Sequence, residues 1–195
     1  MNAEGDSSGN SAAAEQGCDA SSSEPGPQPG SPGGGEPEPG VTIDVAAPGV
    51  EGHDADWIRD RLESVVSLVE TEIDRRIVRC SVRLVADPVM SEAHQRFSGV
   101  EGTTDVLTFV SESEAGIEID LLACVDEASR RCSEFDHDLR RELLLYSVHG
   151  LLHAIGHDDH EPEAHALMHA EEDRLLTKIG VGPVFRSQPG EEGAP

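Results

Sequence analysis

Hydrophobic and polar residues alternate with two different periods along the middle of the chain. Residues 56–73 place apolar side chains three or four positions apart, which is the spacing of an amphipathic helix. Residues 77–86 alternate apolar and polar side chains, the period of a half-buried strand. Short apolar runs predict three further strands, at 41–46, 105–110 and 117–125.

The second half of the chain has a helical pattern. Helical spacing runs through residues 126–135, 137–156 and 162–179, and a shorter helix is expected at 89–97. We expect Gly156 to end the longest of these helices as a left-handed C-cap. The order of elements predicts an α+β fold, with a small mixed four-stranded sheet packed with about five or six helices.

Composition separates one folded segment from the two ends of the chain. Residues 1–40 contain no aromatic residue and no Ile, Leu or Val, and they are rich in Gly, Pro and Ser. Such a segment buries too little apolar surface to offset its ordering entropy. We therefore expect a disordered acidic tail at 1–40, a folded domain at 41–180 and a second disordered tail at 181–195.

Charge and hydropathy narrow the functional classes. The chain has 39 acidic residues against 14 Lys and Arg, a formal net charge of −25. A nonspecific nucleic-acid binder usually carries the opposite sign. No apolar run approaches the ~20 residues that span a bilayer, and the N-terminus lacks a signal-peptide pattern. We expect a cytoplasmic protein without a membrane partner.

The clearest chemical pattern is the string HGLLHAIGHDDH at residues 149–160. Histidines four positions apart on a helix, here His149 and His153, can direct two imidazole nitrogens at one cation. The glycine turn that follows brings Asp159 and His160 near, and either could be a third ligand. Three protein ligands leave a position for water, as in catalytic zinc sites. The pattern predicts one Zn²⁺, or another divalent ion, at the end of the long central helix.

The residue after the first histidine bears on whether the chain could hydrolyse peptides. Zinc proteases with the same histidine spacing carry a glutamate there as general base. This chain has Gly150 instead. Glycine inside a helix costs about 1 kcal/mol relative to alanine, so we infer that another part of the protein approaches the backbone at this point. A metallopeptidase is the less favoured interpretation.

Two motifs together resemble one known family. The histidine string, and TTDVLTF at residues 103–109, are similar to the patterns HGxLHxxGxxH and TDVLSF of the YbeY family of rRNA maturation factors. The resemblance covers about residues 54–180 and implies a four-stranded sheet packed with helices. It also implies a single-strand-specific, metal-dependent endoribonuclease for 16S rRNA 3′-end maturation and ribosome quality control. The implied partners are single-stranded rRNA and a ribosomal subunit or ribosomal protein, and no DNA is expected.

The resemblance also assigns the metal ligands. His149 and His153 match the first two ligands of the family. Counting without gaps places Asp159 at the third position, and a bulge of one residue in the loop would place His160 there instead. Carboxylate is an acceptable zinc ligand, so Asp159 is preferred and His160 is kept as its rival.

The upstream motif departs from the family pattern at one position. The family commonly has an arginine where this chain has Ser98, so Arg96, two residues earlier, is the expected substitute in RNA binding and catalysis. Thr104 is expected to contact substrate and Asp105 to assist catalysis, unless both serve to start the strand. A non-catalytic ribosome-assembly factor with a structural metal site is the main alternative, and Ser98 favours it.

Overall fold

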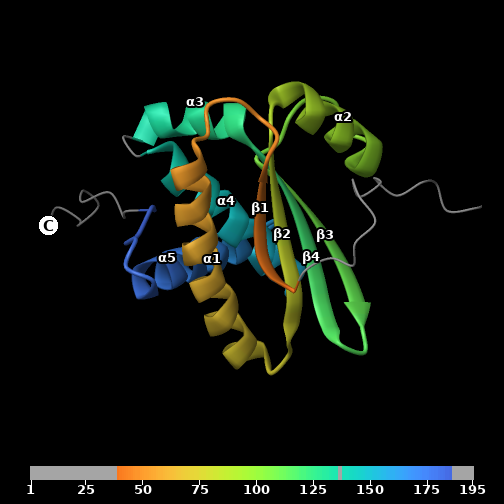
Figure 1. Ribbon diagram of the computed structural model, residues 1–195, viewed down its shortest axis with the longest axis vertical. Helices are drawn as coiled ribbons and strands as arrows, with labels where there is room; N and C mark the ends of the chain where they lie inside the picture. Colours follow the sequence, from red (N-terminus) through yellow and green to blue (C-terminus); the bar gives the residue numbers. More distant parts are fainter. Residues whose placement is uncertain (1–38, 136–137, 186–195) are drawn as a thin grey trace, which may run out of the picture. The chain divides into compact units, whose positions relative to one another are not determined.

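A computed structural model describes residues 39–135 and 138–185 of the chain (Figure 1). Its strands are β1 (Gly40–Val45), β2 (Ile77–Val85), β3 (Val106–Ser113) and β4 (Gly116–Cys124). Its helices are α1 (Gly52–Ile73), α2 (Asp87–Ser98), α3 (Val125–Phe135), α4 (Leu139–Ala154) and α5 (Pro162–Lys178). The α+β class and the order of elements predicted from the hydrophobic pattern are confirmed.

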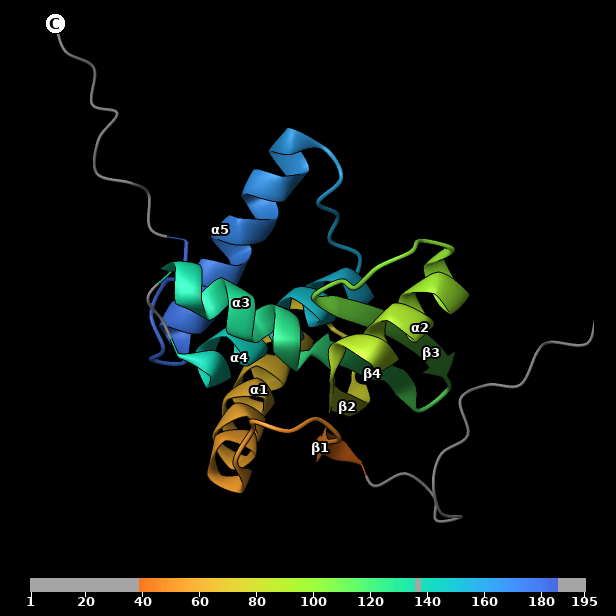
Figure 2. The ribbon, with the colours of Figure 1, turned by 90° about the horizontal axis from the view of Figure 1, so that it is seen from above.

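The four strands form one mixed sheet in the order β1-β2-β4-β3. β1, β2 and β4 are parallel to one another, and β3 is antiparallel to β4. Helix α1 supplies the crossover that the parallel pair of β1 and β2 requires. In Figure 2, α1, α3, α4 and α5 lie together to the left of the strands, and α2 lies apart from them on the right.

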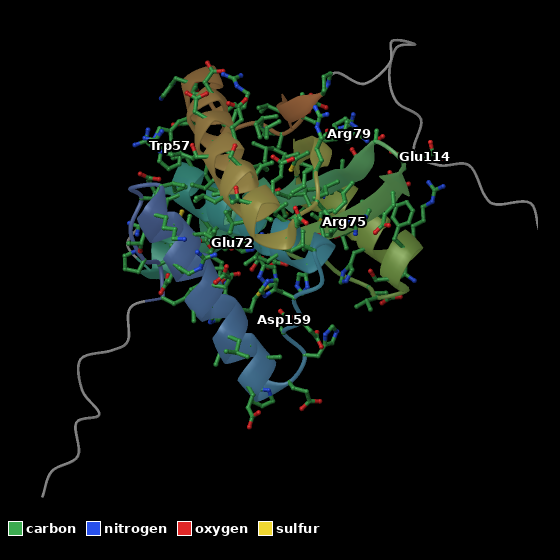
Figure 3. All side chains as sticks on the ribbon, turned by 90° about the horizontal axis from the view of Figure 1, so that it is seen from below. Trp57, Glu72, Arg75, Arg79, Glu114 and Asp159 are labelled. Atoms are coloured by element: carbon green, nitrogen blue, oxygen red, sulfur yellow. The ribbon has the colours of Figure 1, made fainter. Side chains whose placement is uncertain are left out.

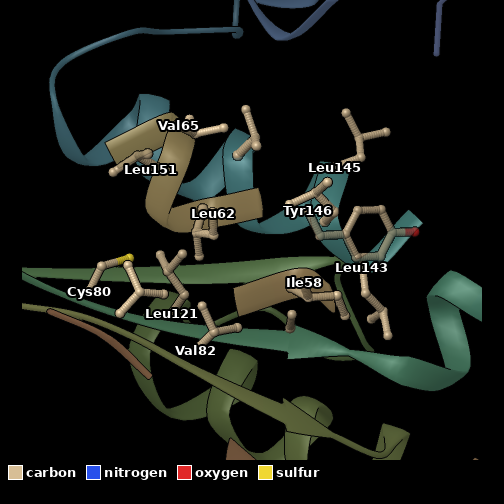
Figure 4. Packing of buried hydrophobic residues seen from close by; sticks show 14 of the residues in the cluster. Ile58, Leu62, Val65, Cys80, Val82, Leu121, Leu143, Leu145, Tyr146 and Leu151 are labelled. Atoms are coloured by element: carbon tan, nitrogen blue, oxygen red, sulfur yellow. The ribbon is translucent and has the colours of Figure 1, made fainter. Parts of the chain in front are cut away.

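The alternation of side chains along β4 explains how the sheet packs on both sides. Ile119 and Leu121 belong to the main hydrophobic core, which they share with α1 and α4 (Figure 4). Leu122 and Cys124 point to the opposite side and join a smaller cluster with Met90 of α2. Helix α2 is therefore held by a separate core from the one that holds α4.

Helix α4 is the central helix of the main core, and Gly150 lets it approach the sheet. A Cβ atom at this position would lie 2.9 Å from Leu121 Cδ2, 3.0 Å from Thr108 Oγ1 and 3.1 Å from Val106 Cγ2. The hydroxyl of Thr108 donates a hydrogen bond of 3.2 Å to the carbonyl of Gly150. The inference that another part of the protein approaches the backbone here is confirmed.

The expected tails lie mostly outside the described residues. Residues 1–38 and 186–195 are in the parts of the chain that the structure does not describe. In the described part of the C-terminal tail, the N–H groups of Val184 and Phe185 donate to Asp173 of α5, so this part packs against the domain. Across residues 39–135 and 138–185, no helix combines the length and apolar character that a membrane span requires.

Candidate metal centre

The last turns of α4 carry two histidines and end in a glycine turn. The Nε2 atoms of His149 and His153 are 3.0 Å apart. Gly156 has a φ of 103°, and the N–H of His157 donates to the carbonyl of Leu152 at 3.0 Å. These are the left-handed residue and the long-range hydrogen bond of a Schellman motif. The prediction that Gly156 caps this helix is confirmed.

The loop after this turn brings a carboxylate to the two histidines. Asp159, labelled in Figure 3, lies on the loop between α4 and α5. Its Oδ2 is 3.6 Å from His149 Nε2, and its Oδ1 is 3.6 Å from His153 Nε2. One donor atom from each of the three residues lies within 4.8 Å of the others. The structure thus groups His149, His153 and Asp159 as donors to a single ion.

His160 stands outside this group. Its side chain is 83% exposed, and its Nδ1 contacts the carboxylate of Asp158. Its Nδ1 lies 3.9 Å from Asp159 Oδ1. Between the two residues left open by the sequence, the geometry favours Asp159 as the third ligand.

Each histidine is oriented by a hydrogen bond at its other ring nitrogen. His149 Nδ1 is 2.6 Å from Oε1 of Glu172, a carboxylate of α5 that is 1% exposed. His153 Nδ1 is 3.1 Å from the carbonyl oxygen of His157. A carbonyl only accepts hydrogen bonds, so the Nδ1 of His153 is the donor, and in a neutral ring this leaves the lone pair on Nε2. Such partners fix the ring orientation of metal-binding histidines.

The surroundings of His149 raise its pKa. Burial of the ring acts to lower the pKa, but the hydrogen bond to Glu172 and the charges of Glu172, Asp105 and Asp159 act in the other direction and outweigh it. The site thus attracts positive charge, whether a proton or a metal ion. A metal ion bound here would therefore compete with protons for the same histidine.

The donor group opens on a cavity of about 990 Å³. Its lining comes from the segment just before β3, from α3, α4 and α5, from the loop between α4 and α5, and from the segment after α5. The lining residues are Thr103, Thr104, Asp105, Glu127, Arg131, Arg141, Glu142, Leu145, Tyr146, His149, Asp159, His165, His169, Glu172, Pro183, Val184 and Phe185. The volume is at the upper end of the ~300–1,000 Å³ typical of ligand sites.

Thr104 and Asp105 both line this cavity. Asp105 Oδ1 accepts hydrogen bonds from the Thr104 hydroxyl at 2.9 Å and from the N–H of Val106 at 2.8 Å. These contacts organise the start of β3, which is one of the two roles that the sequence left open. The same carboxylate faces the cavity and acts electrostatically on His149.

Arg96 is placed elsewhere. It lies in the last turn of α2, with its guanidinium carbon 5.2 Å from the ring centre of Phe97, and it does not line the cavity. The reason is that α2 packs on its own small core, on the other side of the sheet from α4. The arginines that line the cavity are Arg131 of α3 and Arg141 of α4. Sequence reasoning missed both, because charged positions on helices usually face solvent.

The chain is similar to known proteins over a range that includes all three residues of the candidate metal centre. A family model described as endoribonuclease YbeY matches residues 50–180. An endoribonuclease YbeY of Frankia alni is 33% identical over 135 residues, which cover 60% of this chain and 75% of that protein. An endoribonuclease YbeY of Chlorobium phaeovibrioides is 30% identical over 122 residues, 63% of this chain and 82% of that protein.

A solved structure is also similar to this chain. The solution structure of TM1509 from Thermotoga maritima has a TM-score of 0.47 and 24% sequence identity, and the match covers 76% of this chain and 99% of that chain. The family match includes Glu172 and every donor of the candidate centre, and it stops before Pro183 and Phe185.

Proposed function

Because the chain belongs to the endoribonuclease YbeY family, we propose that it is a metal-dependent endoribonuclease that hydrolyses phosphodiester bonds of single-stranded RNA. Its proposed role is 16S rRNA 3′-end maturation and ribosome quality control, with rRNA and a ribosomal subunit or ribosomal protein as partners. The proposed location is the cytoplasm. The proposed cofactor is one Zn²⁺ ion, although another divalent metal would suit the same donors.

The observation that carries this proposal is the convergence of His149, His153 and Asp159. Two imidazole nitrogens that face each other at 3.0 Å, beside a carboxylate, repel one another unless a proton or a cation lies among them. Two nitrogens and one carboxylate oxygen are a donor set that zinc accepts. The residues present therefore fit the metal that the family resemblance implies.

The chain's own residues would prepare the site for hydrolysis. Glu172 and the carbonyl of His157 hold the two imidazole rings so that both Nε2 atoms face the loop. When bound, a divalent ion there supplies Lewis-acid chemistry, acidifying a water and polarising a phosphoryl oxygen. Asp105 faces the same cavity, and its proposed role is to orient the attacking water.

We assign the stabilisation of developing phosphate charge to Arg131, not to Arg96. Arg131 lines the cavity with its side chain 51% exposed. Arg141 lines it too, and its Nη2 donates to the carbonyls of Gly182 and Pro183, so it holds the segment after α5. Arg131 lies beside Glu127 of its own helix, with 4.0 Å between Nε and Oε1. The positive charge of Arg131 can stabilise the negative charge that develops on the phosphoryl oxygens in the transition state. Replacing Arg131 by glutamine should therefore reduce kcat, and Arg96→Gln should change it much less.

Two other functions make different predictions. A metallopeptidase would need a base after the first histidine, and position 150 faces Leu121, Thr108 and Val106 of the sheet. A glutamate at that position would project into the sheet and not into the cavity. A non-catalytic assembly factor with a structural metal would bind single-stranded RNA or a ribosomal protein and cleave nothing.

The deciding experiment measures metal content and RNA cleavage of the same purified samples. We expect wild-type protein to hold about one metal ion and to cleave a single-stranded RNA, and the double variant His149→Ala/His153→Ala to lose both. His53→Ala, an exposed histidine at the start of α1, is the matched control. Unchanged metal content and cleavage in the double variant would refute the proposal, and metal without cleavage in wild type would favour the assembly factor.

A further inference from the structure

One wall of the cavity is a stack of aromatic rings that the proposed hydrolysis does not use. The rings of His169 and Phe185 are 3.7 Å apart between centroids and within 5° of parallel. His165, one turn earlier on α5, lies 4.0 Å from His169 at an interplanar angle of 57°. All three line the same cavity as His149 and Asp159.

The stack is held in place from two sides. Asp173 of α5 accepts hydrogen bonds from the N–H groups of Val184 and Phe185, at 2.7 and 3.1 Å. From α4, Arg141 Nη2 donates to the carbonyls of Gly182 and Pro183, at 3.2 and 2.7 Å. Two helices thus fix the backbone that carries Phe185. The position of the Phe185 ring beside the cavity is therefore fixed by hydrogen bonds to α4 and α5.

The two outer rings of the stack are exposed, so another aromatic ring could stack on them. His169 lies in the middle and is half-buried, whereas Phe185 is 36% exposed and His165 is exposed as well. Aromatic rings bind flat π-systems such as nucleobases by stacking, and this attraction does not depend on net charge.

The charge of the protein makes such an attraction necessary. The formal net charge is −25, and phosphate attraction to a basic surface is the usual source of nonspecific nucleic-acid affinity. In this cavity the arginines are Arg131 and Arg141, and they share it with Asp105, Glu127, Glu142, Asp159 and Glu172. A strand of RNA held here needs contacts to its bases.

We propose that His165, His169 and Phe185 form a nucleobase-stacking platform, on which an unpaired base of the RNA substrate lies while an adjoining phosphate reaches the candidate metal centre. This inference rests on the proposed endoribonuclease function and names the part of the substrate that the cavity recognises. A single strand is required, because a base paired in a duplex cannot leave its partner to stack on protein rings without the cost of unpairing.

The test compares RNA binding by full-length variants with metal chelated, so that no cleavage occurs. The probe is a short single-stranded RNA that carries 2-aminopurine, whose fluorescence falls when the base stacks. Phe185→Ala and His165→Ala should each raise the dissociation constant about fivefold or more, with less quenching. Phe185→Tyr, which keeps an aromatic ring, should bind like wild type. Leu167→Ala is the matched control, because this residue is 71% exposed on α5 and does not line the cavity.

Salt dependence separates stacking from a phosphate contact. Loss of a stacked base leaves the slope of log affinity against log salt unchanged, whereas loss of a phosphate contact makes it shallower. We expect an unchanged slope for Phe185→Ala and a shallower slope for Arg131→Gln. A shallower slope for Phe185→Ala would overturn the platform.

The outcomes distinguish this inference from the proposed function. If wild-type protein cleaves RNA but Phe185→Ala and His165→Ala bind and cleave as wild type does, the platform is wrong and the endoribonuclease stands. If wild type binds and quenches the probe but never cleaves with metal restored, the platform stands and the endoribonuclease falls. If wild type binds no single-stranded RNA, both are wrong.

Discussion

His149 of α4 is hydrogen-bonded to Glu172 of α5, with 2.6 Å between Nδ1 and Oε1. The carboxylate is 1% exposed, and its second oxygen, Oε2, has no hydrogen-bond partner among the described residues. Burying a carboxylate is costly unless a positive charge is nearby. Glu172 is therefore placed to favour a cation on the far side of the His149 ring.

The first prediction concerns this pair. Glu172→Gln removes the charge and keeps the shape, so we expect the affinity for zinc to fall about 10-fold to 100-fold. The measurement is competition with a fluorescent chelator at neutral pH. Glu171→Gln, on the same helix and paired with Arg174 outside the cavity, is the control and should bind zinc as wild type does. Equal affinities in the two variants would show that Glu172 serves only packing.

The second prediction decides the third ligand. Asp159→Ala should lose most of its bound metal, because both carboxylate oxygens face histidine nitrogens at 3.6 Å. His160→Ala should keep its metal, since its ring contacts Asp158 and is 83% exposed. Elemental analysis of the purified proteins measures both. Loss of metal in His160→Ala with retention in Asp159→Ala would reverse the assignment.

The third prediction tests the close approach of α4 to the sheet. In Gly150→Ala the new methyl meets three side-chain atoms at 2.9 to 3.1 Å. Overpacking costs about 1–3 kcal/mol and helix propensity returns about 1 kcal/mol, so the free energy of unfolding should fall by roughly 1 kcal/mol. Gly52→Ala in α1 meets nothing within 4 Å and should be neutral or stabilising. Urea denaturation compares the two, and equal stabilities would contradict the packing argument.

The fourth prediction concerns pH. Glu142 is 4% exposed, and its burial raises the pKa of its carboxyl above the ordinary value for glutamate, with the negative charges of Asp105 and Glu127 acting in the same direction. Between the ordinary pKa and the raised one the folded state holds more protons, so stability falls as pH rises through this window.

Glu142→Gln cannot ionise at this position and should not show that fall. We therefore expect it to be more stable than wild type at pH 7, with the difference shrinking as pH is lowered toward the ordinary pKa of glutamate. Urea denaturation at a series of pH values measures this. Glu63→Gln, on the exposed side of α1, is the control. A difference that stays constant with pH would point to lost contacts and not to ionisation.

Much of the local structure was predictable, because it depends on short sequence spacing. The alternation in β2 and the three- and four-residue spacing in α1 follow from backbone geometry, so these elements were located within a few residues of their observed ends. His149 and His153 face one way because residues four apart on a helix are neighbours. Gly156 ends α4 because glycine readily adopts the left-handed conformation.

Contacts between distant elements could not be predicted in the same way. Arg96 was the expected cation because it lies two residues before Ser98, where the family commonly has an arginine, yet α2 packs on a separate core and Arg131 of α3 lines the cavity instead. From the sequence, the segment at 181–185 was expected to be part of a disordered tail, because it follows the last helix and contains Gly and Pro. It is held by Asp173 and Arg141, whose carboxylate and guanidinium meet its backbone only when α4 and α5 are packed together.

By itself, the sequence determined the elements, the α+β class and the two histidines on one helix face, since each depends on periods of two to four residues. The tertiary structure decided which of Asp159 and His160 reaches those histidines, and it placed Glu172 behind His149. It also built the aromatic wall of the cavity. These contacts join residues separated by a turn or a whole helix, and their distances depend on how the helices pack, which spacing along the chain does not specify.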